Sequence, residues 1–305
     1  MRFHFVLTNH YPFGVYRIED HIKLIAGGLA DLGHKVTYGF DDDILPWPAV
    51  NLLVEFFNDS PVVDQVIGLK RAATRYVFGL ICTEDLQDSS VMDHPDFPDR
   101  RPSLEKLLPH MDFAWTVVPS DYGGLAGGDK VRFLEYGYVP SLRRQGVLER
   151  DIAVLFYGFV GPRRMPLFEG LAARGLSVSM TTGILPGYFK HDLLDRARTV
   201  VDARRSEDAR FLAPARIATV LHAGVAVVCE KFDTSPLASF YQYVAAVEFR
   251  DLLDVAERVA RSDQCLALGA AGREAFAQNT SMAANLRRVM DVPLFAEAAE
   301  AAAGA

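Results

Sequence analysis

The chain has 305 residues, of which half are hydrophobic and 23% are charged, and its formal net charge is -7 at pH 7. This length suits two α/β domains of roughly 150 residues each, and this composition excludes a disordered chain. The acidic balance argues against a nucleic-acid partner, because such binding needs clustered excess Lys and Arg.

The sequence also indicates where the protein works. No apolar run is long enough to span a bilayer, and the start, MRFHFVLTNHYPFG, lacks the apolar length and the cleavage site of a signal peptide. We therefore expect a cytoplasmic protein with no transmembrane segment, and contact with a membrane surface stays open. The three cysteines, Cys82, Cys229 and Cys265, are far apart among apolar neighbours, which predicts buried, reduced thiols.

The first half of the chain alternates strand and helix patterns. Residues 2–8 predict a short strand, apolar residues spaced three and four apart predict a helix over 18–32, and residues 35–40 predict a second strand. Such a β-α-β unit is right-handed and parallel. Further strands are predicted at 51–56, 75–82, 113–118 and 131–136, and further helices at 60–72 and 102–108. This alternation indicates a doubly wound parallel sheet.

Three residues of the first half are candidates for a general base. The loop 9–14 follows the first strand at the carboxyl edge of the sheet, where binding loops lie. His10 and His21 lie in or near this loop, and an imidazole titrates near neutrality. Glu84 follows the strand 75–82 at the same edge. The alternatives are structural histidines for His10 and His21, and a helix cap in a solvated loop at 84–101 for Glu84.

An acidic triplet follows the second predicted strand. Asp41, Asp42 and Asp43 are similar to an Asp-x-Asp motif that holds a divalent cation, but three acidic residues after a strand are also typical of a solvated turn. We expect the solvated turn and no metal site.

The composition changes after the first series of strands. The charged stretch SLRRQGVLERD has no strand pattern, which places a domain boundary there. We therefore expect a first domain at 1–145, a second at 146–290 and a frayed tail at 291–305.

The second domain begins with a candidate phosphate site. The strand 151–158 leads into a helix over 162–173 through a turn that holds Gly158, Arg163 and Arg164. A glycine lets the backbone approach a ligand, and a helix N-terminus favours an anion. An arginine can bind a phosphate group through two parallel hydrogen bonds. Glycine turns and paired surface arginines are each common, and their coincidence at one junction favours phosphate binding.

The later part of the domain predicts a second candidate position. A helix pattern stops at Gly224, and the buried run 225–229 then delivers Glu230 at a carboxyl strand end, so that Arg216 and Glu230 bracket a crevice. The mixed-charge stretch 202–210 is predicted as a loop near the diphosphate, with an ordinary solvated surface as the alternative. Other strands are predicted at 177–181, 199–202 and 246–249, and helices at 191–197 and 250–262.

Two stretches resemble known proteins. The segment FGVYRIEDHIKLIAGGLADLGHKVTY resembles the opening of GT-B glycosyltransferases, and the segments DIAVLFYGFVGPRR and PARIATVLHAGVAVVCEKFD resemble the nucleotide-binding domain of family-one-like and spore-maturation-type members. The resemblance implies two Rossmann-like doubly wound domains that face a central cleft. It also implies an acceptor-binding first domain, a nucleotide-sugar-binding second domain, and neither a metal nor another cofactor.

The resemblance carries over to individual residues. Those that match the family's donor-site pattern are Gly14 in the first loop, Gly158, Arg163 and Arg164 in the phosphate loop, Arg216 in the penultimate helix, and Glu230, which is expected to reach the ribose or the sugar. Phe211 and Thr219 stand where retaining members carry two glutamates, and Cys229 stands where serine is usual. The choice between retention and inversion therefore stays open.

We expect a glycosyltransferase that moves a sugar from a nucleotide-diphosphate donor to a hydroxyl acceptor, which is a glycan, a lipid-linked molecule or a small molecule, as in polysaccharide biosynthesis. If the reaction inverts, His10, His21 or Glu84 would remove the acceptor's proton. Two alternatives stay open: a non-catalytic partner that binds a sugar nucleotide or a glycan, and a sugar-nucleotide epimerase or hydrolase of the same architecture.

Overall fold

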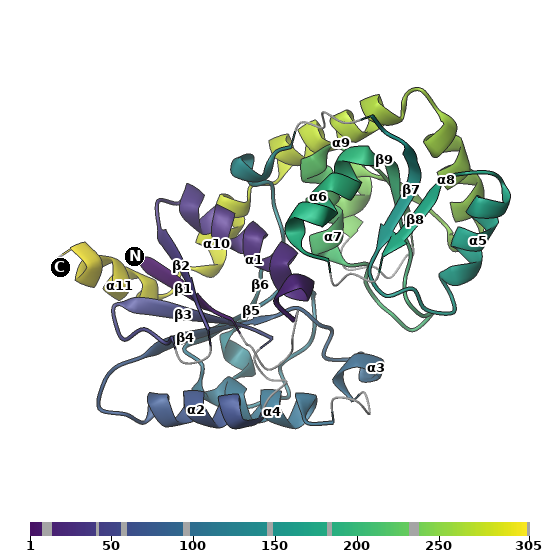
Figure 1. Cartoon of the computed structure of the whole chain (residues 1–305). Coiled ribbons are helices and arrows are strands. Elements are labelled where there is room, and N and C mark those ends of the chain that lie inside the picture. The colour runs from purple at the N-terminus through teal and green to yellow at the C-terminus, as the bar shows by residue number, and fades with distance from the viewer. Residues whose placement is uncertain are drawn as a thin grey trace. The chain divides into compact units, whose positions relative to one another are not determined.

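The structure, a computed structural model, describes residues 1–7, 14–40, 43–55, 60–93, 98–144, 149–181, 185–231 and 238–303. The chain divides into two compact units, of which one comprises Met1–Tyr136 with Met282–Ala305 and the other comprises Gly137–Ser281. Each unit is built on one parallel sheet with helices on both faces (Figure 1). The predicted fold class, doubly wound and Rossmann-like in both halves, is confirmed.

The sheet of the first unit has six parallel strands in the order β2-β1-β3-β4-β5-β6. Their bounds are β1 (Arg2–Val6), β2 (Lys35–Gly39), β3 (Ala49–Val54), β4 (Val77–Cys82), β5 (Phe113–Thr116) and β6 (Val131–Phe133). Every residue of β3 and β4 is buried, as expected for central strands covered on both faces. The strand order reverses between β1 and β3, because the chain places β2 on one side of β1 and β3 on the other.

The helices of the first unit form two layers (Figure 1). Helices α1 (Gly14–Asp31) and α10 (Met282–Val289) cover one face of the sheet, and α2 (Ser60–Lys70) and α4 (Arg100–Leu107) cover the other. The predicted irregular loop 84–101 contains one helical turn, α3 (Ser89–Met92).

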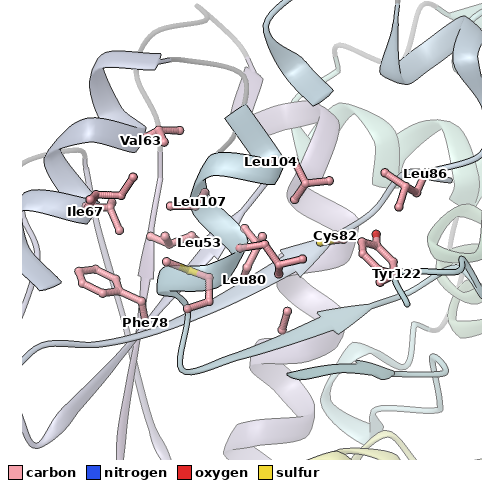
Figure 2. Packing of buried hydrophobic residues seen from close by; sticks show 14 of the residues in the cluster. Leu53, Val63, Ile67, Phe78, Leu80, Cys82, Leu86, Leu104, Leu107 and Tyr122 are labelled. Atoms are coloured by element: carbon pink, nitrogen blue, oxygen red, sulfur yellow. The ribbon is translucent and has the colours of Figure 1, made fainter. Parts of the chain in front are cut away.

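The core under α2 and α4 is visible in Figure 2. Val63 of α2 and the pair Leu104 and Leu107 of α4 belong to one buried cluster with Phe78 and Leu80 of β4. Burial of such side chains contributes about 1.5–3 kcal/mol each to folding. This core therefore fixes α2 and α4 on the sheet.

The C-terminal segment differs from its prediction. Residues 282–303 belong to the first unit, and the expected frayed tail is a helix, α11 (Pro293–Ala303). Gly28 of α1 allows the close packing of α10, because a Cβ atom at this position would lie 2.5 Å from Cγ of Met282. The ring of Phe295 is buried, with its centroid 4.9 Å from that of Phe113. These apolar contacts join the segment to the first sheet.

The sheet of the second unit has five parallel strands in the order β11-β10-β9-β7-β8. Their bounds are β7 (Ile152–Tyr157), β8 (Val178–Thr181), β9 (Ala197–Asp202), β10 (Ala226–Glu230) and β11 (Ala245–Val247). Here the strand order reverses between β7 and β9. In open α/β sheets the ligand crevice lies outside the carboxyl ends of the strands at such a reversal.

The helices of the second unit also form two layers. Helices α5 (Met165–Ala173) and α8 (Leu252–Arg261) pack on one face, and α6 (Gly187–Arg196) and α7 (Pro214–Ala223) on the other (Figure 1). Helix α7 ends at Gly224, whose φ of 64° is left-handed and whose N–H caps the carbonyls of Leu221 and Val220. A further helix, α9 (Cys265–Asn279), packs beside α7 and β10.

The described start of the stretch predicted as a linker between domains packs on the second unit. Arg144 forms an ion pair with Asp195 of α6, and Nη2 of Arg143 lies 2.9 Å from Oε1 of Glu274 in α9. The second unit consequently begins at Gly137, whereas the sequence places the boundary at residue 145.

The cysteines and the helix lengths concern the chain as a whole. All three cysteines are free and buried, as predicted. Within the described ranges, every helix is too short or too polar to cross a membrane.

Candidate functional site

The strand ends at the reversal of the second sheet bring together residues that are distant in sequence. Strand β7 is followed by Gly158, β9 ends at Asp202, and β10 ends at Glu230. The φ of Gly158 is 136°, a conformation that side chains rarely allow. Because the strands are parallel, these three positions lie along one edge.

Glu230 gathers two arginines at this edge. Its side chain is 1% exposed and accepts hydrogen bonds from both Nη atoms of Arg163, each at 2.8 Å. It also accepts bonds from the backbone N–H of Arg204 at 2.8 Å and from Nε of Arg204 at 2.9 Å. Burial raises the pKa of Glu230, but the hydrogen bonds from Arg163 and Arg204 outweigh burial and lower the pKa below its ordinary value. Glu230 therefore stays ionised and fixes both guanidinium groups.

Arg216 of α7 pairs with Asp202. Nη1 of Arg216 lies 2.7 Å from Oδ1 of Asp202, and the two side chains are 12% and 0% exposed. Nε of Arg216 and Oδ2 of Asp202 are both buried without a hydrogen-bond partner in the part of the chain that the structure describes. A Cβ atom at Gly158 would lie 2.3 Å from Nη2 of Arg216, so the glycine makes room for the guanidinium group.

Arg164 adds a further guanidinium group to the same neighbourhood. It donates from Nε to the carbonyl of Ala203 at 2.8 Å and from Nη1 to the carbonyl of Phe159 at 2.5 Å. Burial lowers the pKa of Arg164 to about 10, and the positive charges of Arg216, Arg205 and Arg163 act in the same direction against the carboxylate of Asp202. The arginines are therefore close enough for their charges to act on one another, and an anion bound among them would relieve the repulsion.

The second-unit residues singled out in the sequence therefore converge. Gly158, Arg163, Arg164, Arg216 and Glu230 lie at one edge of one sheet, and the loop after β9 contributes Arg204, which accords with the expectation that this loop lies near the same site. The sequence did not reveal the role of Asp202. The only sequence feature that points to Asp202 is its position as a charged residue at the end of a predicted buried strand.

The described candidates of the first unit lie on different elements. His21 lies in α1, and its Nδ1 lies 2.6 Å from the hydroxyl of Tyr136. Burial raises the pKa of Tyr136, so its hydroxyl stays protonated, and the hydrogen bond between the two side chains favours a structural role for His21. Glu84 follows β4 at the carboxyl edge, and Gly14 is the first residue of α1. His10 lies outside the described residues.

The acidic triplet is only partly described. The backbone carbonyl of Asp43 accepts a hydrogen bond from Nε2 of His4 at 2.7 Å, and Asp41 and Asp42 lie outside the described residues. In the described parts of the chain, no three His, Cys, Asp or Glu side chains are grouped in a way that could hold a metal ion.

Two Rossmann-like domains built on parallel sheets of six and five strands define the GT-B fold, and this is the fold of the chain. Solved structures agree. T4 phage BGT, described in complex with its UDP-glucose substrate, aligns over 96% of this chain and 100% of its own, with a TM-score of 0.57 and 9% identity. AviGT4, described as a glycosyltransferase involved in avilamycin A biosynthesis, aligns over 100% and 99%, with a TM-score of 0.56 and 15% identity.

The structure of OtsA without ligand aligns over 95% of this chain and 99% of its own, with a TM-score of 0.52 and 9% identity. No protein-family model matches the sequence, and no curated protein matches it. The likeness at this low identity is one of fold.

Proposed function

We propose that the protein transfers a sugar from a nucleotide-diphosphate donor to a hydroxyl acceptor. The observation that carries the proposal is the arginine cluster at the strand reversal of the second sheet, where guanidinium groups repel one another and Nε of Arg216 has no partner within the described residues. A diphosphate would supply negative charge against this repulsion and an acceptor oxygen for Nε of Arg216. The UDP-glucose substrate of T4 phage BGT, a protein of the same fold, gives further support.

The cluster suits the chemistry of the transfer. When the bond between the sugar and the diphosphate breaks, negative charge grows on the leaving diphosphate, and fixed positive groups stabilise it. Arg163, Arg164 and Arg216 supply these groups in the proposal, without a metal ion or another cofactor. Glu230 holds Arg163 and Arg204 in position, and its expected contact with the ribose or the sugar requires one of them to release it.

The first unit binds the acceptor in this proposal. Glu84, which follows β4 at the carboxyl edge, and His21 in α1 are the described candidates for removing the acceptor's proton. His10, in the loop 9–14, remains a candidate from the sequence.

Thermal melting with a panel of nucleotide sugars tests donor binding. A ligand at 100 times its Kd stabilises the folded state by about 2.7 kcal/mol, which raises the Tm of a chain of this size by about 4 °C. We expect at least one UDP-, GDP-, ADP- or dTDP-sugar to produce this shift. A flat response to the whole panel would contradict the proposal.

Substitution of Arg216 tests the role of the cluster in turnover. Loss of a hydrogen bond to a charged group costs about 1.5–3 kcal/mol, so Arg216→Ala should lower the rate of donor turnover at least about tenfold. Arg174→Ala is the control, because Arg174 is an exposed residue of the α5 end that pairs with Asp254 and Glu257. Unchanged turnover in Arg216→Ala would remove this residue from the mechanism.

The alternatives from the sequence give different results in the same assays. Phe211 and Thr219 stand in place of the glutamate pair of retaining enzymes, which favours a non-catalytic binding partner as the second candidate. Such a protein would bind a nucleotide sugar without consuming it. A hydrolase would convert the donor with water at a rate that no hydroxyl acceptor raises, and an epimerase would convert the sugar without net release of the nucleoside diphosphate.

A further inference from the structure

Glu55 occupies the strand reversal of the first sheet. It directly follows β3, which lies beside β1 on the side opposite β2. Its backbone N–H donates to the carbonyl of Ile81 in β4 at 3.1 Å, which fixes the residue at the carboxyl end of the two central strands. This is the position where an open α/β sheet binds its ligand.

The backbone of Glu55 is unusual. Its φ is +48°, and it is the single non-glycine residue with a positive φ in the described ranges. A residue with a Cβ atom is uncommon in this conformation, and such strain gathers at ligand-binding and active sites. The conformation therefore has a cost that the fold itself does not explain.

The side chain of Glu55 is also unsatisfied. Oε1 is buried and has no hydrogen-bond partner among the residues that the structure describes. A buried polar atom of this kind lowers stability unless something completes its hydrogen bonding. A hydroxyl group that donates to Oε1 would do so.

The charges around Glu55 favour proton exchange near neutral pH. Burial raises the pKa of its carboxyl to about 8, the negative charge of Glu84 acts in the same direction, and Arg100 and Arg17 act against them. Burial raises the pKa values of the nearby Cys82 and Tyr136, and the negative charge of Glu55 raises them further. A general base is most effective when its pKa lies close to the working pH.

We propose that Glu55 binds the acceptor's hydroxyl group and takes its proton during the transfer. The acceptor's O–H bond breaks and the proton passes to the carboxylate of Glu55, while the acceptor oxygen forms a bond to the anomeric carbon. The bond from that carbon to the diphosphate breaks, and the electron pair leaves with the diphosphate. Glu55 then returns its proton to water. This inference rests on the proposed glycosyl transfer and names a base that the sequence did not single out.

The experiment uses water as the acceptor, because the natural acceptor is unidentified. The probe is whichever of UDP-glucose, GDP-mannose, ADP-glucose and dTDP-glucose raises the Tm, and the readout is release of the nucleoside diphosphate. Glu55→Gln keeps the size of the side chain and removes the base. Glu105→Gln, on the exposed surface of α4, is the matched control.

We expect Glu55→Gln to bind the donor with unchanged affinity and to release the diphosphate at least 100-fold more slowly, whereas Glu105→Gln behaves as wild type. The wild-type kcat/KM should rise with pH, reach half of its plateau near pH 8 and level off above it, and Glu55→Gln should lose this dependence. In protein with ¹³C-labelled glutamate carboxyl groups, one signal should titrate near pH 8 and be missing from Glu55→Gln.

The outcomes separate this inference from the proposed function. Wild-type turnover in Glu55→Gln, a pH dependence that survives the substitution, or a Glu55 signal that titrates in the ordinary glutamate range would overturn the role of Glu55 and leave the transferase standing. A wild-type protein that binds no donor, or that binds it and releases no diphosphate with water or with any added hydroxyl acceptor, would overturn both.

Discussion

At the scale of single residues, the two buried carboxylates of the arginine cluster are used differently. Glu230 accepts hydrogen bonds at both oxygens from two arginines, so its bonding is complete. Asp202 accepts one bond from Arg216, and one atom of each partner stays unsatisfied within the described part of the chain. Glu230 therefore acts first as a fixed anchor, and the pair of Asp202 with Arg216 keeps bonding capacity for a ligand.

The anchoring role of Glu230 predicts a loss of stability on substitution. Glu230→Gln removes the negative charge that Arg163 and Arg204 share, and breaking a buried ion pair costs about 3 kcal/mol or more. Urea unfolding should show this loss. Glu257→Gln, which changes a surface glutamate paired with Arg174 and Arg261, should have a much smaller effect, because exposed ion pairs are screened by water. Equal stability of Glu230→Gln and wild type would contradict the anchoring role.

The sequence revealed the members of the cluster but not their pairing. Arg163 and Arg164 were predicted from a glycine turn that opens a helix, and Arg216 from its helix before a buried strand. The pairing of Arg163 with Glu230 spans 67 residues and depends on the spatial order of β7, β9 and β10, which no local pattern encodes. Glu55 was missed because a positive φ and an unsatisfied oxygen have no signature in the sequence.

At the scale of elements, the turn between β7 and α5 depends on Gly158. Its positive φ and its closeness to Arg216 leave no space for a side chain. We expect Gly158→Ala to displace the guanidinium group of Arg216 and to weaken donor binding by at least about tenfold, the effect of losing one charge-assisted hydrogen bond.

The control for this substitution is Gly175→Ala. Gly175 also has a positive φ, of 78°, but a Cβ atom there would contact nothing within 4 Å. This variant should lose stability and keep its donor affinity, as measured by calorimetry. If Gly158→Ala also kept its affinity, the turn would not be part of the donor site.

Helix α7 carries a buried histidine that should make stability depend on pH. Nδ1 of His222 lies 2.7 Å from the carbonyl of Ala218, and Nε2 accepts the backbone N–H of Val139 at 2.8 Å, so the ring is neutral with its proton on Nδ1. Burial lowers the pKa of His222 from 6.5 to about 4, although the bond to Ala218 acts in the opposite direction.

Because the folded pKa lies below the unfolded value, the unfolded chain takes up the proton first as the pH falls. The contribution of His222 is fully present above pH 6.5 and is lost between about pH 6.5 and pH 4, in total about 3 kcal/mol. The difference in unfolding free energy between pH 7 and pH 4.5 should be smaller in His222→Gln than in wild type. An identical pH dependence in the two proteins would show that His222 does not cause it.

The elements themselves were largely predictable, and the exceptions have physical causes. Parallel strands covered on both faces leave continuous apolar runs, and β4 and β10 match their predicted ranges closely. The association of α10 and α11 with the first sheet was missed, because an amphipathic helix shows which face it buries and not which sheet covers it. The close approach of Gly28 and Met282, which packs α10 against α1, joins positions 254 residues apart.

At the scale of the whole molecule, the chain passes between its two units twice, after Tyr136 and after Ser281. Within the second unit the two connecting segments are paired, since the N–H of Tyr138 donates to the carbonyl of Thr280 at 2.8 Å and Tyr138 bridges to Ser281. The donor half of the proposed activity is contained in this unit, because Gly158, Arg163, Arg164, Arg216 and Glu230 all belong to Gly137–Ser281.

The most direct test of the account is a calorimetric titration of the nucleotide sugar that raises the Tm into wild type and into the double variant Arg163→Ala/Arg216→Ala. The account predicts one donor molecule bound per chain, with an affinity that falls at least about 100-fold in the double variant, since each lost charge-assisted bond contributes a factor of about ten. Equal affinity in the two proteins, or no binding of any nucleotide sugar to wild type, would contradict it.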